Sequence, residues 1–313
     1  MKQKRTKLLR FQYDDARTIE LPVALLIGSK EGPDVAITAG INGCEKNSVL
    51  AAIKLLRDLS SAEICGSVKI LTLCNIAAFN DHTFTNSLSE DKILNRSFPG
   101  SLTGSYNKQV AAKILDEIKG ADCYIDLHSG AALVRSTPIA AYHRGMNGHL
   151  NDSCHQTAFY SGIPNIVITE SESHWGDDGT AYSSVYEHIG IPSVLFTTGG
   201  TGGHSTDNLD MICSAVKNVL ARLGVLRGIV RQNHKPRIFE GMERVKAKVS
   251  GIHINRVTIG DFVKRGQIIS VIADYFGNIK EKITSPIDGM VLSISESPAI
   301  REDDVVASVG IIL

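Results

Sequence analysis

The stretch "VAITAGINGCEKNS", residues 35–48, joins an apolar run to a short polar turn and then to a helical pattern. Residues 35–39 carry the apolar and β-branched side chains of a strand that is covered on both faces. The Asn-Gly pair that follows is a strong turn signal. The stretch therefore predicts a buried strand whose carboxyl end leads through a tight loop into a helix over residues 46–59.

The same alternation of apolar runs and helical patterns continues to about residue 228. Expected strands are 21–27, 35–39, 68–73, 123–127, 138–142, 165–169 and 193–197, and expected helices are 46–59, 106–118, 148–160, 180–189 and 208–222. This alternation predicts an α/β fold with a mixed, mostly parallel sheet flanked by helices. In such sheets, binding sites form beyond the carboxyl ends of the strands, so we expect the functional residues there.

The pattern changes from about residue 238, where short β-like runs are broken by Gly-Asp, Arg-Gly and Phe-Gly-Asn turns. We expect residues 1–228 to form the α/β domain, 229–237 a linker, and 238–313 a small all-β barrel or sandwich module. The turns of this module resemble those of biotinyl and lipoyl modules, but the hairpin of "SPIDGMVL" has no lysine. A role as a lid or as a contact in a homo-oligomer is therefore favoured over cofactor carriage.

The overall charge is balanced, with 33 basic and 33 acidic residues among 313. This argues against a nucleic-acid or anionic-membrane partner that is attracted by net charge. No apolar run approaches the length of a membrane span, and no apolar core follows the basic segment 1–10. The six cysteines form no C-x-x-C pair, so we expect free buried thiols in a cytoplasmic protein.

Two strand ends carry side chains that suit a metal site. In "YIDLHSG", residues 124–130, Asp126 and His128 are two apart and share a face of the strand. This suits a histidine ligand whose ring is fixed by a carboxylate, or an ordinary hydrogen-bonded histidine. Glu45 is a metal ligand or an acid that complements the helix dipole. Asn42 is a weak amide ligand or a turn residue.

A third motif, "ILNRSFPGS" at residues 93–101, places Asn95 and Arg96 before a Pro-Gly turn. A guanidinium fork matches a carboxylate, and the amide adds a donor, so the pair suits a substrate anion. Arg135 is a further candidate for the same carboxylate. The alternative is an arginine that anchors its loop by bonding backbone carbonyl groups.

Taken together, "GINGCE", "CNIAAF", "ILNRSFPG", "DLHSG" and "VLFTTGGTGG" resemble the succinylglutamate desuccinylase/aspartoacylase family in order and spacing. The family is similar to zinc carboxypeptidases, and "SPIDGMVL" resembles the C-terminal domain of bacterial members. The resemblance implies a zinc-carboxypeptidase-like fold and hydrolysis of the amide bond in a small carboxylated N-acyl amino acid. It implies that Glu45 and His128 are zinc ligands, and that Asn95 and Arg96 grip the substrate carboxylate.

Four positions depart from the family pattern. Asn42 stands where the family has its first histidine ligand, and Thr197 where it has its catalytic glutamate. Leu88 lies about where an oxyanion-stabilising arginine would be, and Ile93 replaces the acid of Asp-Leu-Asn-Arg. An amide oxygen in place of imidazole weakens zinc binding and shifts the preference towards harder divalent metals.

Other residues are candidates for the altered roles. Glu170 and Glu172 are candidates for the catalytic base, and Lys92 is the nearest cation to the lost arginine. His174 and His204 are candidates for the missing ligand.

Two functions follow from these residues. The first is a metal-dependent hydrolase with an atypical, weakened zinc site. The alternative is an inactive family member that binds a carboxylated metabolite. A third hypothesis is metal-free chemistry or ligation that uses the Asn95–Arg96 pair and Cys44, and only position supports it.

Overall fold

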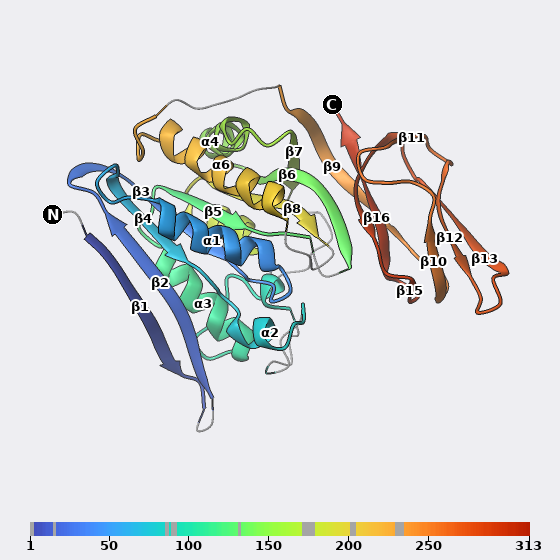
Figure 1. Cartoon of the computed structure of the whole chain (residues 1–313), viewed down its shortest axis with the longest axis horizontal. Helices are drawn as coiled ribbons and strands as arrows, with labels where there is room; N and C mark the ends of the chain where they lie inside the picture. Colours follow the sequence, from blue (N-terminus) through green and yellow to red (C-terminus); the bar gives the residue numbers. More distant parts are fainter. Residues whose placement is uncertain are drawn as a thin grey trace.

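The computed structural model describes residues 3–14, 17–84, 88, 93–130, 133–170, 179–200, 205–228 and 235–313. In this part of the chain, one long sheet runs through the molecule from the N-terminal strand to the C-terminal strands (Figure 1). Its first strands, in spatial order, are β1 (Gln3–Gln12), β2 (Thr18–Ile27), β4 (Cys65–Leu71), β3 (Lys30–Ala39), β5 (Cys123–Leu127), β8 (Ser193–Gly200), β6 (Val134–Arg144) and β7 (Asn165–Glu170).

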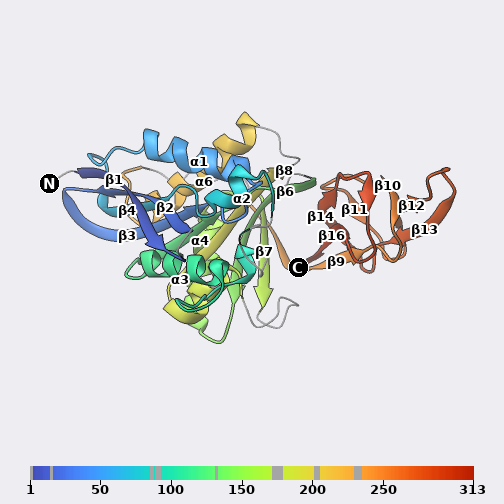
Figure 2. The ribbon, with the colours of Figure 1, turned by 90° about the horizontal axis from the view of Figure 1, so that it is seen from below.

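The helices flank this part of the sheet. They are α1 (Lys46–Asp58), α2 (Ile76–Asn80), α3 (Tyr106–Ile118), α4 (Gly148–Tyr160), α5 (Ala181–Ser184) and α6 (Thr206–Arg222), with a 3₁₀ turn, η1 (Leu94–Arg96), and a π turn, η2 (Val185–Ile189). One buried cluster packs α1, α4 and α6 against the sheet, and a second packs α3 and α5 against the other face. Figure 2 shows α1 and α6 on one side of the sheet and α3 on the other.

The central pairings of the sheet are mixed. β3 pairs in parallel with β4 and β5, β5 with β8, and β6 with β7, whereas β6 and β8 are antiparallel. The expected mixed, mostly parallel α/β sheet is confirmed. The expected helix over 180–189 forms as the short α5 followed directly by η2.

The strand β1 was not predicted from the sequence. This strand pairs along its whole length with β2 in an antiparallel register, from Gln3 opposite Ile27 to Gln12 opposite Thr18. Most of its side chains are exposed, but Leu9 and Phe11, which alternate with Arg10 and Gln12, are partly buried and pack against the core. This short alternation was the available signal for a strand. The basic N-terminal segment is therefore an outer strand of the sheet.

The C-terminal region is built from strands, as expected. The long sheet continues through β9 (Arg237–Lys246), β16 (Val305–Ile312), β14 (Gly289–Ser295) and β11 (Phe262–Val263), and a second sheet contains β13 (Ile279–Thr284), β12 (Ile268–Ala273), β10 (Gly251–Asn255) and β15 (Ala299–Ile300). β9 pairs with β7, and β14 pairs with the start of β6, so the sheet passes into this region without a break. Residues 229–234 of the expected linker lie outside the described residues, and the division into domains stays a prediction.

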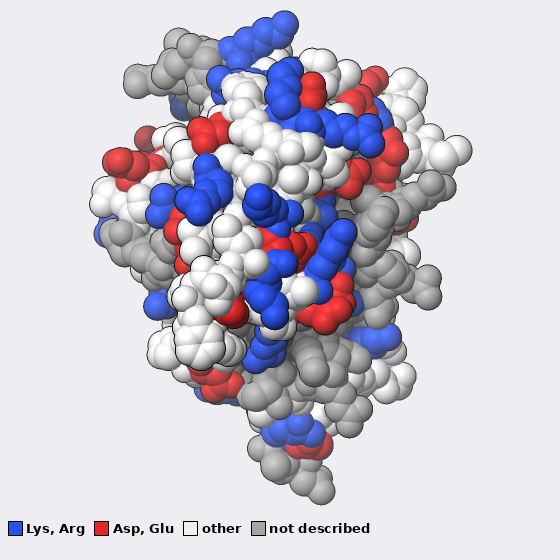
Figure 3. Space-filling view, turned by 90° about the vertical axis from the view of Figure 1, so that its right-hand side faces the viewer, with Lys and Arg blue, Asp and Glu red and all other residues white. Residues whose placement is uncertain are grey.

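No disulfide joins any of the six cysteines, all of which are described, and all except Cys65 are buried. Among the described residues, no helix is both long and apolar enough to cross a membrane. Lysine, arginine, aspartate and glutamate side chains are interspersed on the face at the C-terminal end of the molecule (Figure 3). One such pair is Lys264 and Asp288, whose Nζ and Oδ2 atoms are 3.2 Å apart.

Candidate active site

Two neighbouring parallel strands bring the candidate metal ligands together. In the register of β3 and β5, Ala39 lies opposite Leu127, so both strands end at the same edge of the sheet. The loop after β3 carries Asn42 and Glu45, and His128 follows β5 directly. The backbone N–H of His128 donates to Phe196 O of β8 at 2.7 Å, which fixes the start of its loop.

The loop after β3 is shaped by glycine. Gly40 has a positive φ of 64°, a conformation that other residues rarely adopt. Gly43 packs so closely on α2 that a Cβ atom would lie 2.1 Å from the carbonyl carbon of Ala78. Glu45 is the N-cap residue of α1 but makes no side-chain cap bond, so its carboxylate is directed into the site instead.

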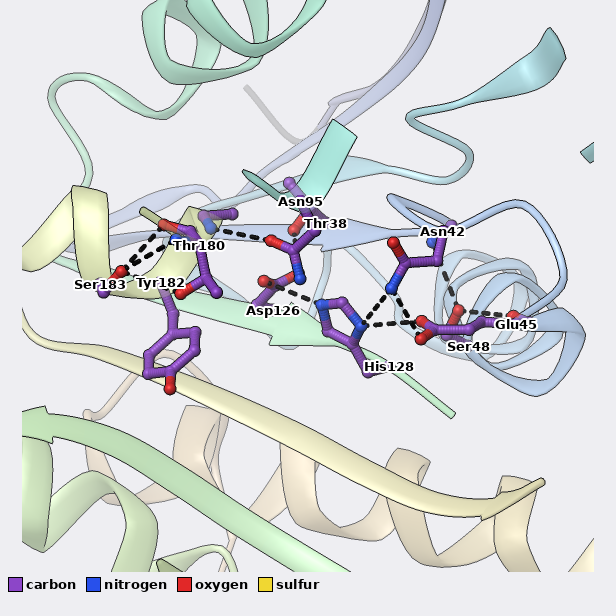
Figure 4. A network of polar contacts seen from close by, with 12 residues as sticks. Thr38, Asn42, Glu45, Ser48, Asn95, Asp126, His128, Thr180, Tyr182 and Ser183 are labelled. Carbon is purple, nitrogen blue, oxygen red and sulfur yellow. Dashed lines mark hydrogen bonds and ion pairs between the residues drawn. The ribbon is translucent and has the colours of Figure 1, made fainter. Parts of the chain in front are cut away.

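His128 lies between two carboxylates (Figure 4). Its Nδ1 atom is 2.8 Å from Glu45 Oε2, and its Nε2 atom is 3.1 Å from Asp126 Oδ2. Asn42 Nδ2 donates to Glu45 Oε1 at 2.8 Å and lies 3.5 Å from His128 Nδ1. All four side chains are buried. The expected convergence of Glu45 and His128 is therefore present in the structure.

This environment makes His128 a cation. Burial alone would lower its pKa, but the carboxylates of Glu45 and Asp126 outweigh that effect. The pKa of His128 is therefore held well above its ordinary value. The two carboxylates thus favour the protonated, cationic form of the ring.

The donor set fits a divalent cation, but with few strong ligands. His128 Nδ1 faces Glu45, while His128 Nε2 contacts the Asp126 carboxylate. A carboxylate behind the ring in this way is usual for metal-binding histidines. Asn42 Oδ1 is buried without a hydrogen-bond partner in the described residues, which leaves one more oxygen. Those residues contain no group of three or more His, Cys, Asp or Glu side chains that could hold a metal. Two strong donors and one neutral amide are thus available.

Asn95 and Arg96 lie in η1, and Figure 4 shows Asn95 among the residues of this polar network. Asn95 Oδ1 accepts a hydrogen bond from Ala181 N at 3.0 Å, and Arg96 Nη1 donates to the backbone oxygen of Asn95. Arg96 therefore bonds a backbone carbonyl oxygen of its own loop, as the alternative interpretation expected. Burial and the nearby Arg244 lower the pKa of Arg96 to about 10, against the opposite influence of Tyr182 and Glu45. Arg96 remains a cation at neutral pH.

Two other candidates have partners elsewhere. Arg135 Nε lies 3.1 Å from Glu296 Oε1, so this arginine contacts the C-terminal strands. Glu170, at the end of β7, forms an ion pair with Arg144, which also contacts Glu240. These contacts direct both side chains to partners other than His128.

The remaining candidates are not all visible. Lys92, Glu172, His174 and His204 lie outside the described residues. Thr197 is half-buried in β8, next to the residue whose carbonyl oxygen binds the backbone N–H of His128. A hydroxyl group therefore occupies the place where the family pattern has a carboxylate.

Sequence reasoning missed two buried hydroxyl groups behind Asp126. Thr38 Oγ1 donates to Asp126 Oδ1 at 2.9 Å, and the hydroxyl group of Tyr124 lies 2.5 Å from Thr38 Oγ1. The available signal was the alternation along β5, which puts Tyr124 on the same strand face as Asp126. Thr38 needed knowledge of the strand order, because it lies on β3.

Comparison with known proteins agrees with this architecture. The model of the succinylglutamate desuccinylase/aspartoacylase catalytic domain matches residues 31–223. The N-alpha-acetyl-L-2,4-diaminobutyric acid deacetylase of Halomonas elongata is 26% identical over 263 residues, or 82% of this chain and 75% of that protein.

Solved structures show the same fold. The product-bound ectoine utilization protein EutE (DoeB) from Ruegeria pomeroyi has a TM-score of 0.88 at 22% identity, covering 98% of this chain and 95% of that chain. The succinylglutamate desuccinylase/aspartoacylase from Rhodobacter sphaeroides has a TM-score of 0.87 at 22% identity, covering 99% and 95%. The expected carboxypeptidase-like fold is confirmed.

Proposed function

Because this chain belongs to the succinylglutamate desuccinylase/aspartoacylase family, we propose that it is a metal-dependent hydrolase of small carboxylated N-acyl amino acids. The relative from Halomonas elongata is named as a deacetylase of an N-acetylated diamino acid, so the amide of an N-acetyl amino acid is the first bond to test. The observation that carries the proposal is the 2.8 Å approach of His128 Nδ1 to Glu45 Oε2 at one edge of the sheet.

Glu45 and His128 would hold the metal, with Asn42 as a weak third ligand and zinc as the first candidate. When bound there, the metal would polarise the substrate carbonyl group and acidify a water molecule. His174 and His204 are the other candidates for the third ligand. Since the His128 proton must leave before its nitrogen can bind a cation, the metal competes with that proton.

The other roles fall to side chains around this cluster. Asp126 orients the His128 ring, and Arg96 with Asn95 binds the substrate carboxylate through charge-assisted hydrogen bonds. Arg135 is a second candidate for that carboxylate once it leaves Glu296.

The departures from the family pattern leave two roles to be filled. Glu170 and Glu172 are the candidates for the base, and Lys92 is the candidate for the cation near the oxyanion. Use of Glu170 as a base requires that it leave its ion pair with Arg144. We place the protein in the cytoplasm, where its six cysteine thiols would stay reduced.

One observation favours a second function, an inactive protein that binds a carboxylated metabolite. Both carboxylate oxygens of Glu45 are already in contact, with Asn42 and with the His128 imidazolium. Glu45 is thus already engaged by a hydrogen bond and an ion pair, and Thr197 supplies no base. Arg96 would still bind the carboxylate of a ligand.

The test starts from chelator-treated protein, reloaded with Zn²⁺ or Mn²⁺ and assayed on N-acetyl and N-succinyl amino acids. Hydrolysis that depends on added metal and is lost in Glu45→Gln supports the hydrolase. Ligand-induced thermal stabilisation that Arg96→Ala abolishes, without hydrolysis, supports the binding protein. Protein that neither binds added metal nor gains stability with any of these compounds rejects both.

A further inference from the structure

A line of buried polar side chains extends from His128 into the protein core. Tyr124, Asp126 and His128 alternate along β5 and its end, so their side chains lie on one face. Thr38 lies directly opposite Asp126 on the adjacent strand β3. Tyr124, Thr38 and Asp126 are all completely buried, at 0% exposed. Water is therefore not available to replace a hydrogen bond that one of them loses.

The hydrogen bonds of this line are all donated towards Asp126. An ionised carboxylate only accepts hydrogen bonds, so the Thr38 hydroxyl donates its single proton to Asp126 Oδ1, at 2.9 Å. The Tyr124 hydroxyl must then donate to Thr38 Oγ1, at 2.5 Å. With Oδ1 held by Thr38, the second oxygen of Asp126 lies 3.1 Å from His128 Nε2. The first two contacts are hydrogen bonds that lead to one oxygen of Asp126, and the third is an ion-pair contact between the other oxygen and the ring.

We propose that Thr38 and Tyr124 are positioning residues, which hold the Asp126 carboxylate so that the His128 ring keeps Nδ1 turned towards Glu45. Neither residue touches the ring, and both act through Asp126. The Asp126 carboxylate can rotate about its Cβ–Cγ bond, and the Thr38 hydrogen bond selects one of its orientations. The bond from Tyr124 in turn fixes the Thr38 hydroxyl, whose proton would otherwise be free to rotate.

The consequence for catalysis rests on the proposed function, but the orientation of the ring does not. Partners behind a metal-binding histidine typically contribute 10–100-fold to metal affinity or activity. We therefore expect Thr38→Val to weaken Zn²⁺ binding by roughly 10–100-fold, and Tyr124→Phe by about tenfold or less because it lies one contact further away. Thr38→Ser keeps the hydroxyl group and is expected to restore most of the affinity.

The experiment compares ring N–H protons and metal affinity in the same variants. In ¹⁵N-histidine-labelled, metal-free protein, the His128 signals are assigned from their loss in His128→Gln. Thr38→Val is expected to shift the Nε2–H signal and speed its exchange with water, whereas Thr38→Ser resembles the wild type. A competing chromophoric chelator measures Zn²⁺ affinity, and thermal melts report folding.

Thr157→Val is the matched control, because Thr157 is also buried but donates to a backbone oxygen, that of Ser153, within α4. It removes the same atoms without touching Asp126, and its His128 signals should be unchanged. If Thr38→Val does not fold, Tyr124→Phe tests the same line by removing one oxygen atom.

Wild-type signals and Zn²⁺ affinity in the Thr38 and Tyr124 variants would overturn the proposal. So would a wild-type Nε2–H that already exchanges rapidly. Altered ring signals in a protein that hydrolyses nothing would instead leave the positioning role standing and reject the hydrolase.

Discussion

Replacing Asn42 by histidine tests the site most directly, because Asn42 stands where the family pattern has a histidine ligand. In this structure Asn42 Nδ2 donates to Glu45 Oε1 at 2.8 Å, and its side chain is buried. Asn42→His removes that donor from the metal-free state and offers an imidazole nitrogen to the metal-bound state. Both changes favour the metal.

The size of the effect follows from the bond that is lost. A hydrogen bond to a charged group contributes about 1.5–3 kcal/mol, so the metal-free variant should be less stable by about this amount. If the metal-bound state does not suffer the same loss, this alone tightens Zn²⁺ binding by about 10–100-fold. The new imidazole donor adds to that figure.

The assay is Zn²⁺ competition against a chromophoric chelator, with chemical denaturation of the same metal-free samples. Asn42→Ala is the control, because it removes the hydrogen bond but adds no ligand. We expect both variants to lose stability without metal, and Asn42→His to gain more in Zn²⁺ affinity than Asn42→Ala, because only the histidine adds a ligand. Equal Zn²⁺ affinity in Asn42→His and the wild type would refute the reasoning, since position 42 would then not face the metal.

Glu45→Gln leaves the His128 imidazolium paired with Asp126 and should destabilise the metal-free protein in urea unfolding by about 1.5–3 kcal/mol, the contribution of a hydrogen bond to a charged group; no loss would contradict the buried ion pair. Arg96→Lys loses the planar fork and should raise KM, or the Kd of a ligand, more than Arg135→Ala, whose surface pair with Glu296 contributes about 1 kcal/mol or less; the reverse order would exchange their roles. Because the folded pKa of His128 is raised above the unfolded value of about 6.5, its stabilisation is complete below that pH and is lost as pH rises through the folded pKa. Urea unfolding across this pH range, on protein freed of metal by a chelator, checks the sign. In His128→Gln the free energy of unfolding should not show the decrease with rising pH that His128 causes.

The elements that the sequence predicted well carry strong local signals. The helix over Tyr106–Ile118 has the expected bounds, because Ser105 caps it by accepting from Lys108 N and its apolar face packs on the sheet. β5 likewise matches its apolar run. β1 was missed because only Leu9 and Phe11 carry its apolar alternation, while most of its side chains are exposed and its backbone pairs along its whole length with β2.

The contacts of the site likewise divide into those that the sequence predicts and those that it does not. Glu45 and His128 could be predicted to meet, since each follows a buried strand and parallel strands end at a common edge. The pairing of Thr38 with Asp126 could not, because it depends on β3 and β5 being neighbours, which no local pattern indicates. The ion pair of Arg135 with Glu296 depends in the same way on how the C-terminal strands contact β6.

The substitutions in this site act together on a competition between a proton and a metal. Asn42 stands in place of the strong histidine ligand of the family pattern. Its amide also donates a hydrogen bond to Glu45, which stabilises the metal-free state. Asp126 and Glu45 raise the pKa of His128, so each bound metal must displace a proton as well as the Asn42 contact. A metal that binds weakly here at neutral pH would leave His128 charged and the cluster intact, which suits a binding protein. A metal that still binds tightly must take its third ligand from another side chain, so one Zn²⁺ affinity measured at neutral pH separates the two functions.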